Sequence, residues 1–215
     1  MKIFYIEHLK LRKKTRSWLG PILVFSLIMI AYPLTVEFLQ TNLEKSFYSL
    51  LWISILLSMM LATEDIFLED FSDGTLEQTI ISNSSFPLLI AKKIFIYWLM
   101  IGVPISFLSF LFSLSLTQDF NLSLSIFPLS VVSSYIFLNL FVFGNALSLN
   151  KGSVLGAIIT MPLALPVLII LGKSVIAIEF GINYVEFLLL LLGILSIIIT
   201  IVPFIISYVI KAHLE

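Results

Sequence analysis

The 215-residue sequence contains no cysteine and two histidines. A chain without cysteine can form no disulfide bond, no thiol nucleophile and no cysteine-ligated metal site. The histidines, His8 and His213, lie near the ends of the sequence, so the long apolar stretches between them carry no imidazole. We therefore expect no catalytic residue and no metal-binding residue in this chain, and we predict that it is not itself an enzyme.

Charged residues are scarce as well. They form 12% of the sequence, against 60% for hydrophobic residues. A soluble globular domain carries about 25% charged residues. The composition excludes an ordinary water-soluble domain and indicates a protein that lies in a lipid bilayer.

The few charges are clustered, which leaves long uncharged runs. A run of about 18 or more apolar residues is typical of a membrane-spanning helix, and a transmembrane β-barrel would show alternating segments of about 10 residues instead. Six runs qualify as spans: 17–36, 46–63, 94–118, 120–150, 152–172 and 187–210. The sequence thus predicts an all-α membrane protein with six transmembrane helices in a single domain, residues 1–215.

Lysine and arginine predict the orientation of these spans, because cytoplasmic flanks collect them. Six precede the first span: Lys2, Lys10, Arg12, Lys13, Lys14 and Arg16. Six spans then place both termini in the cytoplasm, on the same side as Lys92, Lys93, Lys151 and Lys211. Of the twelve basic residues, Lys45 and Lys173 alone fall outside.

Three further segments depart from a plain spanning helix. Residues 1–16 interleave apolar and basic side chains, which is typical of a cytoplasmic interfacial helix. Residues 173–186 are half apolar and are expected to form a re-entrant or interfacial segment on the outer side. Pro162 and Pro166 lie inside the fifth span and should kink or break it, because each removes a backbone donor.

The sequence offers no energy source for transport. Buried ionisable groups mark proton and ion paths, and no predicted span contains His, Asp, Lys or Arg. Gly172-Lys173-Ser174 looks like the end of a phosphate-binding loop, but the motif needs glycine where this chain has Val167. These observations disfavour a secondary transporter and an ATPase, and they favour a permease that a separate ATPase drives.

Residues 64–93 form the first cytoplasmic loop, and this loop is acidic. Its six carboxylates are Glu64, Asp65, Glu69, Asp70, Asp73 and Glu77. Asp73-Gly74 is a turn signal, and Thr75 with Gln78 fits a capping box that would start a second short helix. The sequence therefore predicts helix, turn and short helix, with apolar side chains toward the membrane.

The acidity of this loop favours docking over lipid binding. Anionic lipid favours basic interfacial helices, so lipid binding explains the carboxylates poorly. A cytosolic protein with complementary basic groups explains them better. An ordinary amphipathic linker remains the alternative.

Several of these residues also resemble the signature region of the CcmB family, the membrane subunit of the cytochrome c maturation ABC transporter. The resemblance rests on Glu64, Phe67, Asp70 and the run from Asp73 to Gln78. It continues through Pro87, Lys92 and Trp98, and through Pro162, Leu165, Pro166 and Val167 of the fifth span. It implies the fold of an ABC-2 type exporter permease.

The resemblance also implies partners and a location. Two copies of this chain would pair with two copies of a CcmA-like ATPase, joined by CcmC-like and CcmD-like membrane proteins and by the heme chaperone CcmE. ATP would be hydrolysed by the partner and heme handled by the complex, with no cofactor assigned to this chain and no nucleic acid involved. The location would be the bacterial inner membrane, or the mitochondrial inner membrane if the chain is organellar.

The implied function is to couple ATP hydrolysis to the release of heme-loaded CcmE. The expected docking and coupling residues are Glu64, Phe67, Asp70, Asp73, Gly74, Glu77 and Gln78. Two alternatives stay open: an ABC-2 permease that exports a polysaccharide, lipid or drug, and a membrane scaffold that assembles partners without transport.

Overall fold

Six helices of the computed structural model are long and apolar enough to cross a membrane. The structure describes residues 15–36, 43–64, 66–82, 85–149 and 153–214. Within these ranges the protein is helical, with no β-strand. The prediction of an all-α, six-span membrane protein is confirmed, whereas most of the predicted interfacial helix at residues 1–16 lies outside the described residues.

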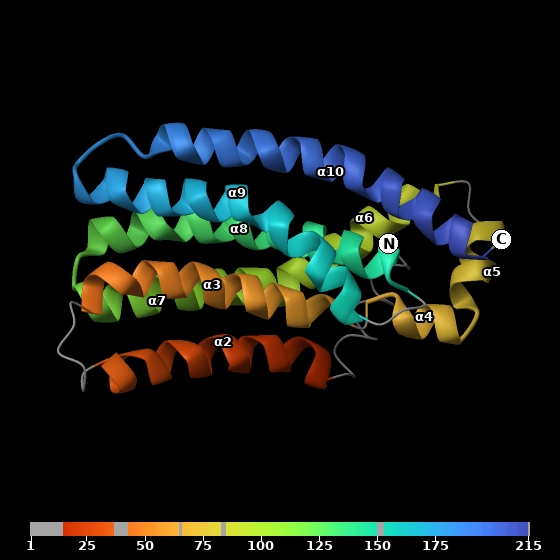
Figure 1. Ribbon diagram of the computed structural model, residues 1–215, viewed down its shortest axis with the longest axis horizontal. Coiled ribbons are helices and arrows are strands. Elements are labelled where there is room, and N and C mark those ends of the chain that lie inside the picture. The colour runs from red at the N-terminus through yellow and green to blue at the C-terminus, as the bar shows by residue number, and fades with distance from the viewer. Residues whose placement is uncertain (1–14, 37–42, 65, 83–84, 150–152, 215) are drawn as a thin grey trace.

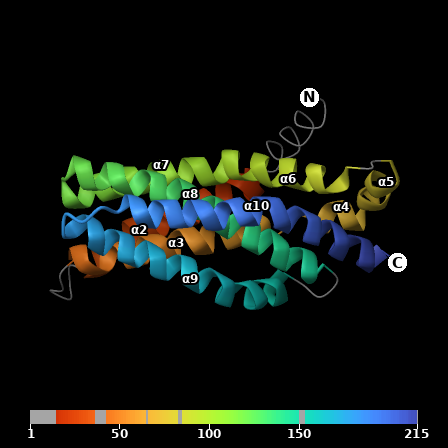
Figure 2. The same ribbon diagram turned by 90° about the horizontal axis from the view of Figure 1, so that it is seen from above.

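The helices form one elongated bundle (Figures 1 and 2). In chain order they are α2 (Thr15–Val36), α3 (Leu43–Thr63), α4 (Leu68–Ser72), α5 (Thr75–Ser82), α6 (Phe86–Tyr97), the π-helix η2 (Trp98–Gly102), α7 (Val103–Thr117), α8 (Phe120–Leu147), α9 (Ser153–Glu179) and α10 (Val185–Leu214). Together α6, η2 and α7 make the third span. The start of α2 and the end of α10 lie at the same end of the bundle, as an even number of spans requires.

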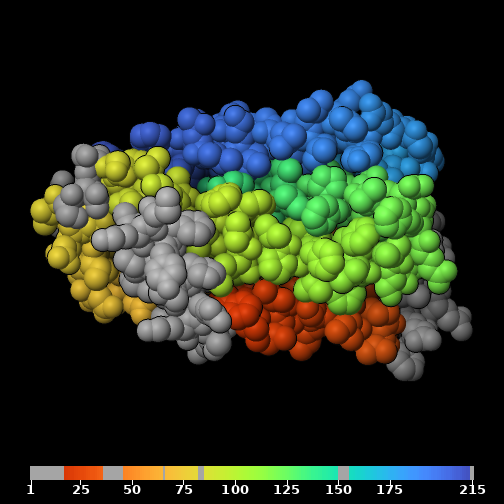
Figure 3. All heavy atoms as spheres, turned by 180° about the vertical axis from the view of Figure 1, so that it is seen from behind, coloured from red at the N-terminus to blue at the C-terminus, as the bar shows by residue number. Residues whose placement is uncertain are grey.

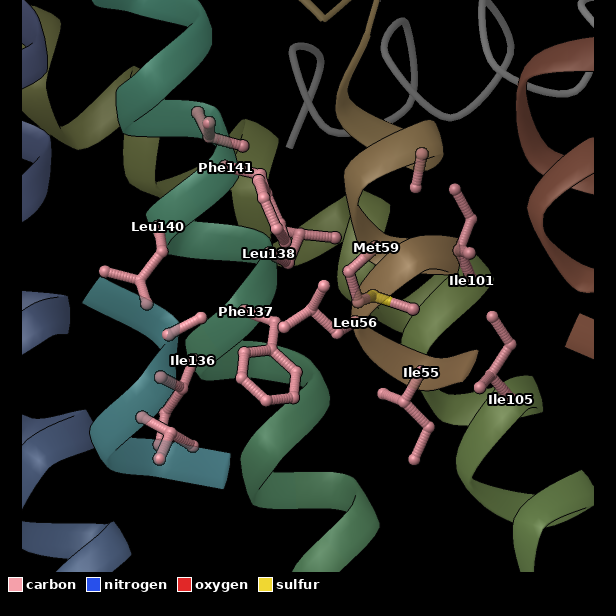
Figure 4. Close-up of a cluster of buried hydrophobic side chains, with 14 of the residues drawn as sticks. Ile55, Leu56, Met59, Ile101, Ile105, Ile136, Phe137, Leu138, Leu140 and Phe141 are labelled. Carbon is pink, nitrogen blue, oxygen red and sulfur yellow. The ribbon is translucent and has the colours of Figure 1, made fainter. Parts of the chain in front are cut away.

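The core of the bundle lies around α8, whose apolar and small side chains are mostly buried. Figure 4 shows Ile55 and Met59 of α3 beside Ile105 of α7 and Phe137 of α8. The outer faces of α2, α9 and α10 instead expose large apolar side chains, among them Leu27, Ile197 and Phe204. In a bilayer such faces are covered by lipid tails, so their exposure carries no penalty.

Buried hydroxyl groups in the spans are mostly satisfied within their own helix. Ser54 donates to the carbonyl of Leu50 at 2.7 Å, and Ser130 to that of Ile126 at 2.9 Å. The amide of Asn139 likewise donates to the carbonyl of Tyr135 at 2.8 Å. Most polar side chains therefore enter the core with their hydrogen-bonding groups paired, since unpaired groups are costly in a bilayer. The exceptions among the described residues are the indole N–H groups of Trp18 and Trp52 and the hydroxyls of Ser58 and Ser148.

Helices α8 and α9 approach each other at two glycines. A methyl group placed on Gly156 would lie 2.4 Å from the carbonyl oxygen of Gly144, and one on Gly144 would lie 2.5 Å from the carbonyl oxygen of Gly156. Small residues allow such close helix contacts in membranes. Gly152 and Gly156 have the spacing G-x-x-x-G, which permits close helix packing, but this spacing does not identify the partner glycine, Gly144.

The fifth span is a single long helix that includes both prolines. Helix α9 continues through Pro162 and Pro166, so it does not break there, although Figure 2 shows that it is curved. Both prolines are exposed, and their role as kink residues stays a prediction. Residues Lys173–Glu179 form the last turns of α9, and a turn at residues 180–184 leads to α10. The helix thus extends beyond the uncharged run, and a re-entrant or interfacial position of residues 173–186 stays a prediction.

Candidate functional site

The acidic loop folds into a helical hairpin, here called the docking hairpin: residues 66–82, comprising α4, α5 and the turn between them. It projects from the end of the bundle that also holds the C-terminal end of α10 (Figure 1). Figure 3 shows it at the opposite end of the molecule from the connection between α9 and α10. The predicted order of helix, turn and short helix is confirmed.

Apolar side chains fasten the docking hairpin to the bundle. Ile66, Phe67 and Leu76 are 2%, 3% and 6% exposed and belong to the main hydrophobic core. Phe71 and Ile80 pack partly against the same core. Ile81 is instead 87% exposed, because successive residues of a helix point in directions about 100° apart.

The turn of the docking hairpin depends on Gly74. Its φ is +70°, a left-handed conformation that favours glycine, and the space around it is open. Helix α5 then starts at Thr75, so the predicted capping box is wrong. The Thr75 hydroxyl donates to the carbonyl of Asp70 at 3.0 Å, and the amide N–H of Gln78 is bonded to the carbonyl of Gly74.

We expect Gly74→Ala to loosen the docking hairpin. A left-handed conformation costs a residue with a Cβ about 1–2 kcal/mol, whereas asparagine tolerates it better. The alanine variant should therefore be cut faster than the wild type by protease within residues 66–82, and Gly74→Asn should lie between them. Equal cutting rates for all three proteins would show that this turn does not require glycine.

The predicted docking residues fall into two groups. Glu64, Asp73, Gly74, Glu77 and Gln78 are exposed, and the last four follow one another from the turn into the first turn of α5. Phe67 and Asp70 lie on the inner side instead, where Phe67 is buried. Asp73, Gly74, Glu77 and Gln78 thus lie on the exposed part of the docking hairpin, whereas Phe67 and Asp70 face the bundle.

The inner group meets Lys93 of α6. The Lys93 ammonium forms an ion pair with the Asp70 carboxylate and lies 5.6 Å from the centre of the Phe67 ring. The Lys93 and Asp70 side chains are 12% and 15% exposed. The sequence placed Lys93 in the orientation signal alone, and no local pattern could have paired it with Asp70, 23 positions away.

A second polar contact joins the end of α3, directly before the docking hairpin, to α8. The side-chain amide of Asn145 donates to the carbonyl oxygen of Thr63 at 2.7 Å and to its hydroxyl at 3.0 Å. Thr63 is the last residue of α3 and directly precedes Glu64. An asparagine at the end of a span gave no sequence signal for this contact, because its partner lies 82 positions away.

No group of three or more potential metal ligands occurs among the described residues. The site consists of exposed carboxylates on a small hairpin, which is held to the bundle by apolar burial, by the ion pair of Lys93 with Asp70 and by the contact of Asn145 with Thr63. Such an arrangement can bind a basic protein surface and pass its movement to the spans.

Comparison with known proteins identifies relatives along nearly the whole chain. The sequence model of the family described as CcmB protein matches residues 2–213. A heme exporter protein B from Haemophilus influenzae is 27% identical over 205 residues, covering 94% of this chain and 93% of that protein. A heme exporter protein B from Pseudomonas aeruginosa is 30% identical over 191 residues, covering 87% and 85%. A third, from Paracoccus denitrificans, is 29% identical over 184 residues.

Proposed function

Since this multi-pass membrane protein belongs to the CcmB protein family, we propose that it is the permease subunit of a heme-exporting ABC transporter that serves cytochrome c maturation. A separate CcmA-like ATPase docks on the hairpin and supplies the energy. In this proposal two copies of the chain and two ATPases assemble with CcmC-like and CcmD-like proteins in a bacterial inner membrane. ATP hydrolysis then releases the heme-loaded chaperone CcmE.

The observation that carries the docking proposal is the separation of charge and apolar surface on the hairpin. Asp73 and Glu77 are exposed, while Phe67 and Leu76 of the same hairpin are buried against the spans. The carboxylates on its outer face would be repelled by anionic headgroups, so lipid binding explains their position poorly. A partner with basic groups gains complementary charge there, which increases specificity and the rate of association.

The proposed mechanism is mechanical. The ATPase closes on ATP and pushes the docking hairpin, whose buried side chains contact the bundle directly. The push rotates the first three spans against the curved α9, and the change of shape at the outer surface weakens the contact between CcmC and CcmE. In this mechanism the chain supplies movement, and the partner carries out the hydrolysis.

Charge reversal at the exposed acidic surface should weaken ATPase binding. We expect Asp73→Lys with Glu77→Lys to reduce co-purification of the ATPase about tenfold or more, since two attractive contacts become repulsive and each factor of ten is about 1.4 kcal/mol. The matched control is Glu186→Lys, which should leave recovery unchanged. Glu186 is an exposed carboxylate in the first turn of α10, and this helix starts at the opposite end of the bundle (Figure 1). Equal recovery from all variants would refute docking at this surface.

The wider complex is tested by purifying the tagged wild-type chain in mild detergent and identifying bound proteins by mass spectrometry. A CcmA-like ATPase together with a CcmC-like protein is the expected result. An ATPase without CcmC or CcmE would instead indicate an ABC-2 exporter of another cargo. CcmC without any ATPase would indicate a scaffold that assembles partners without transport.

A further inference from the structure

Asp70 lies at the point where three helices meet. Its carboxylate pairs with Lys93 of α6, and its backbone carbonyl accepts the hydroxyl of Thr75 at the start of α5. The residue itself belongs to α4. One aspartate therefore joins both helices of the docking hairpin to the third span.

The ion pair is enclosed rather than solvated. The Lys93 and Asp70 side chains are 12% and 15% exposed, and the aromatic ring of Phe67 covers the ammonium group. Enclosed pairs are screened less by salt than surface pairs, and removing one partner leaves the other charge uncompensated. The contact thus resists separation when the docking hairpin is pushed or pulled.

Helix α6 ends in an irregular turn that can serve as a pivot. Five residues after Lys93 the chain forms the π-helix η2, and π-helical turns inside α-helices are frequent at functional sites. Pro104 follows at once and cannot donate a backbone hydrogen bond, so the regular ladder of the third span is weakened at this point. The indole of Trp98 donates to the Ser134 hydroxyl at 3.1 Å, which anchors the pivot to α8.

We propose that Asp70 and Lys93 are positioning residues that transmit movement of the docking hairpin to α6, which tilts about η2 relative to α7. The inference rests on the proposed function and adds the internal path of coupling. The sequence assigned both docking and coupling to Asp70, Asp73 and Glu77. In this inference Asp73 and Glu77 bind the ATPase, whereas Asp70 transmits the movement to α6. Because α6 packs against α10 and α8, its tilt reaches the rest of the bundle.

The test uses the complete complex and measures two quantities: ATPase recovered with the chain, and ATP hydrolysis coupled to CcmE release. We expect Asp70→Asn and Lys93→Gln to retain ATPase recovery within twofold and to lower coupled turnover at least tenfold. The exchange Asp70→Lys with Lys93→Asp should restore most of the turnover. Lys92→Gln is the matched control, because Lys92 is the exposed neighbour of Lys93, and it should behave as the wild type.

The outcomes distinguish this inference from the proposed function. Wild-type turnover in both single variants would overturn the coupling path while leaving the docking surface intact. The inference would also be overturned if the Asp70 and Lys93 variants lost as much ATPase recovery as the charge-reversed variant of Asp73 and Glu77. Binding the ATPase and transmitting its movement would then depend on the same residues. A wild-type chain that recovers no ATPase would instead contradict the proposed function itself.

If the single variants fail to fold, a covalent cross-link in place of the ion pair tests the same inference. The natural chain has no cysteine, so Asp70→Cys with Lys93→Cys can be bridged within this chain by a short bifunctional thiol reagent without side reactions. Bridging should restore coupled turnover, and cleavage of the bridge should abolish it again. Turnover that is the same with and without the bridge would overturn the inference.

Discussion

A single methyl group at Gly156 is expected to push α8 and α9 apart. The added Cβ would lie 2.4 Å from the carbonyl oxygen of Gly144, 2.5 Å from its carbonyl carbon and 2.6 Å from the hydroxyl of Ser148. Two of these three atoms belong to the backbone and cannot rotate away. Extra volume in a packed core costs about 1–3 kcal/mol, and here the strain must be relieved by moving a whole helix.

Gly156→Ala should therefore lower the unfolding temperature of the purified protein clearly, although alanine is the better helix former. The matched control lies on the same helix: Gly172 has nothing within 4 Å of an added Cβ, so Gly172→Ala should be neutral or stabilising by up to about 1 kcal/mol. Thermal denaturation in detergent, followed by circular dichroism and gel filtration, compares the two variants. Equal stability of both would show that α8 and α9 are not held at this distance.

We expect Gly102→Ala to prevent α6 from tilting about η2. Its new Cβ would lie 2.4 Å from Trp98 Cδ1 and 3.3 Å from the Ser134 hydroxyl. The indole cannot move aside freely, because its ring packs 5.6 Å from that of Phe95 and 4.9 Å from that of Tyr135. The substitution should displace Trp98, break its hydrogen bond to Ser134 and reduce coupled ATP turnover about tenfold while the ATPase remains bound.

Two measurements check this expectation. A shift of tryptophan fluorescence in the purified chain, with Trp18 and Trp52 replaced by phenylalanine, would report displacement of Trp98. The ratio of coupled turnover to ATPase recovery would report the loss of coupling. Gly193→Ala, at an open position of α10, is the control for a methyl group in a spanning helix. Normal turnover in Gly102→Ala, with a displaced indole, would exclude η2 as the pivot.

Local patterns in the sequence predicted the spans and the docking hairpin because both depend on neighbouring residues. Uncharged runs predict the helices that cross the membrane, and Asp73-Gly74 predicts the turn at which Gly74 adopts a positive φ. The inner contacts could not be predicted in this way. Asp70 and Asp73 are both aspartates of the same acidic loop, and their neighbours in the sequence do not distinguish them. Asp70 has a lysine partner because Lys93 of α6 lies beside it in the folded protein.

The π-helix and the glycine contact escaped sequence analysis for a similar reason. No local pattern marks the π-helix η2, and its hydrogen bond from Trp98 to Ser134 joins residues 36 positions apart. Gly144 is one small residue in a helix rich in them, and only the crossing of α8 with α9 makes it indispensable. The capping box failed because Gly74 already occupies the position before the helix.

The hydroxyl groups that bond within their own helices have a consequence for biogenesis. The Ser106 and Ser109 hydroxyls of α7 donate to the carbonyls of Gly102 and Ile105, and the Ser174 hydroxyl of α9 donates to that of Ile170. These hydroxyls are already paired before any neighbouring helix is present, whereas the Ser113 hydroxyl of α7 bonds to that of Ser123 in α8. The spans can therefore enter the bilayer one at a time as they leave the insertion machinery, and side-by-side assembly can follow as a later step.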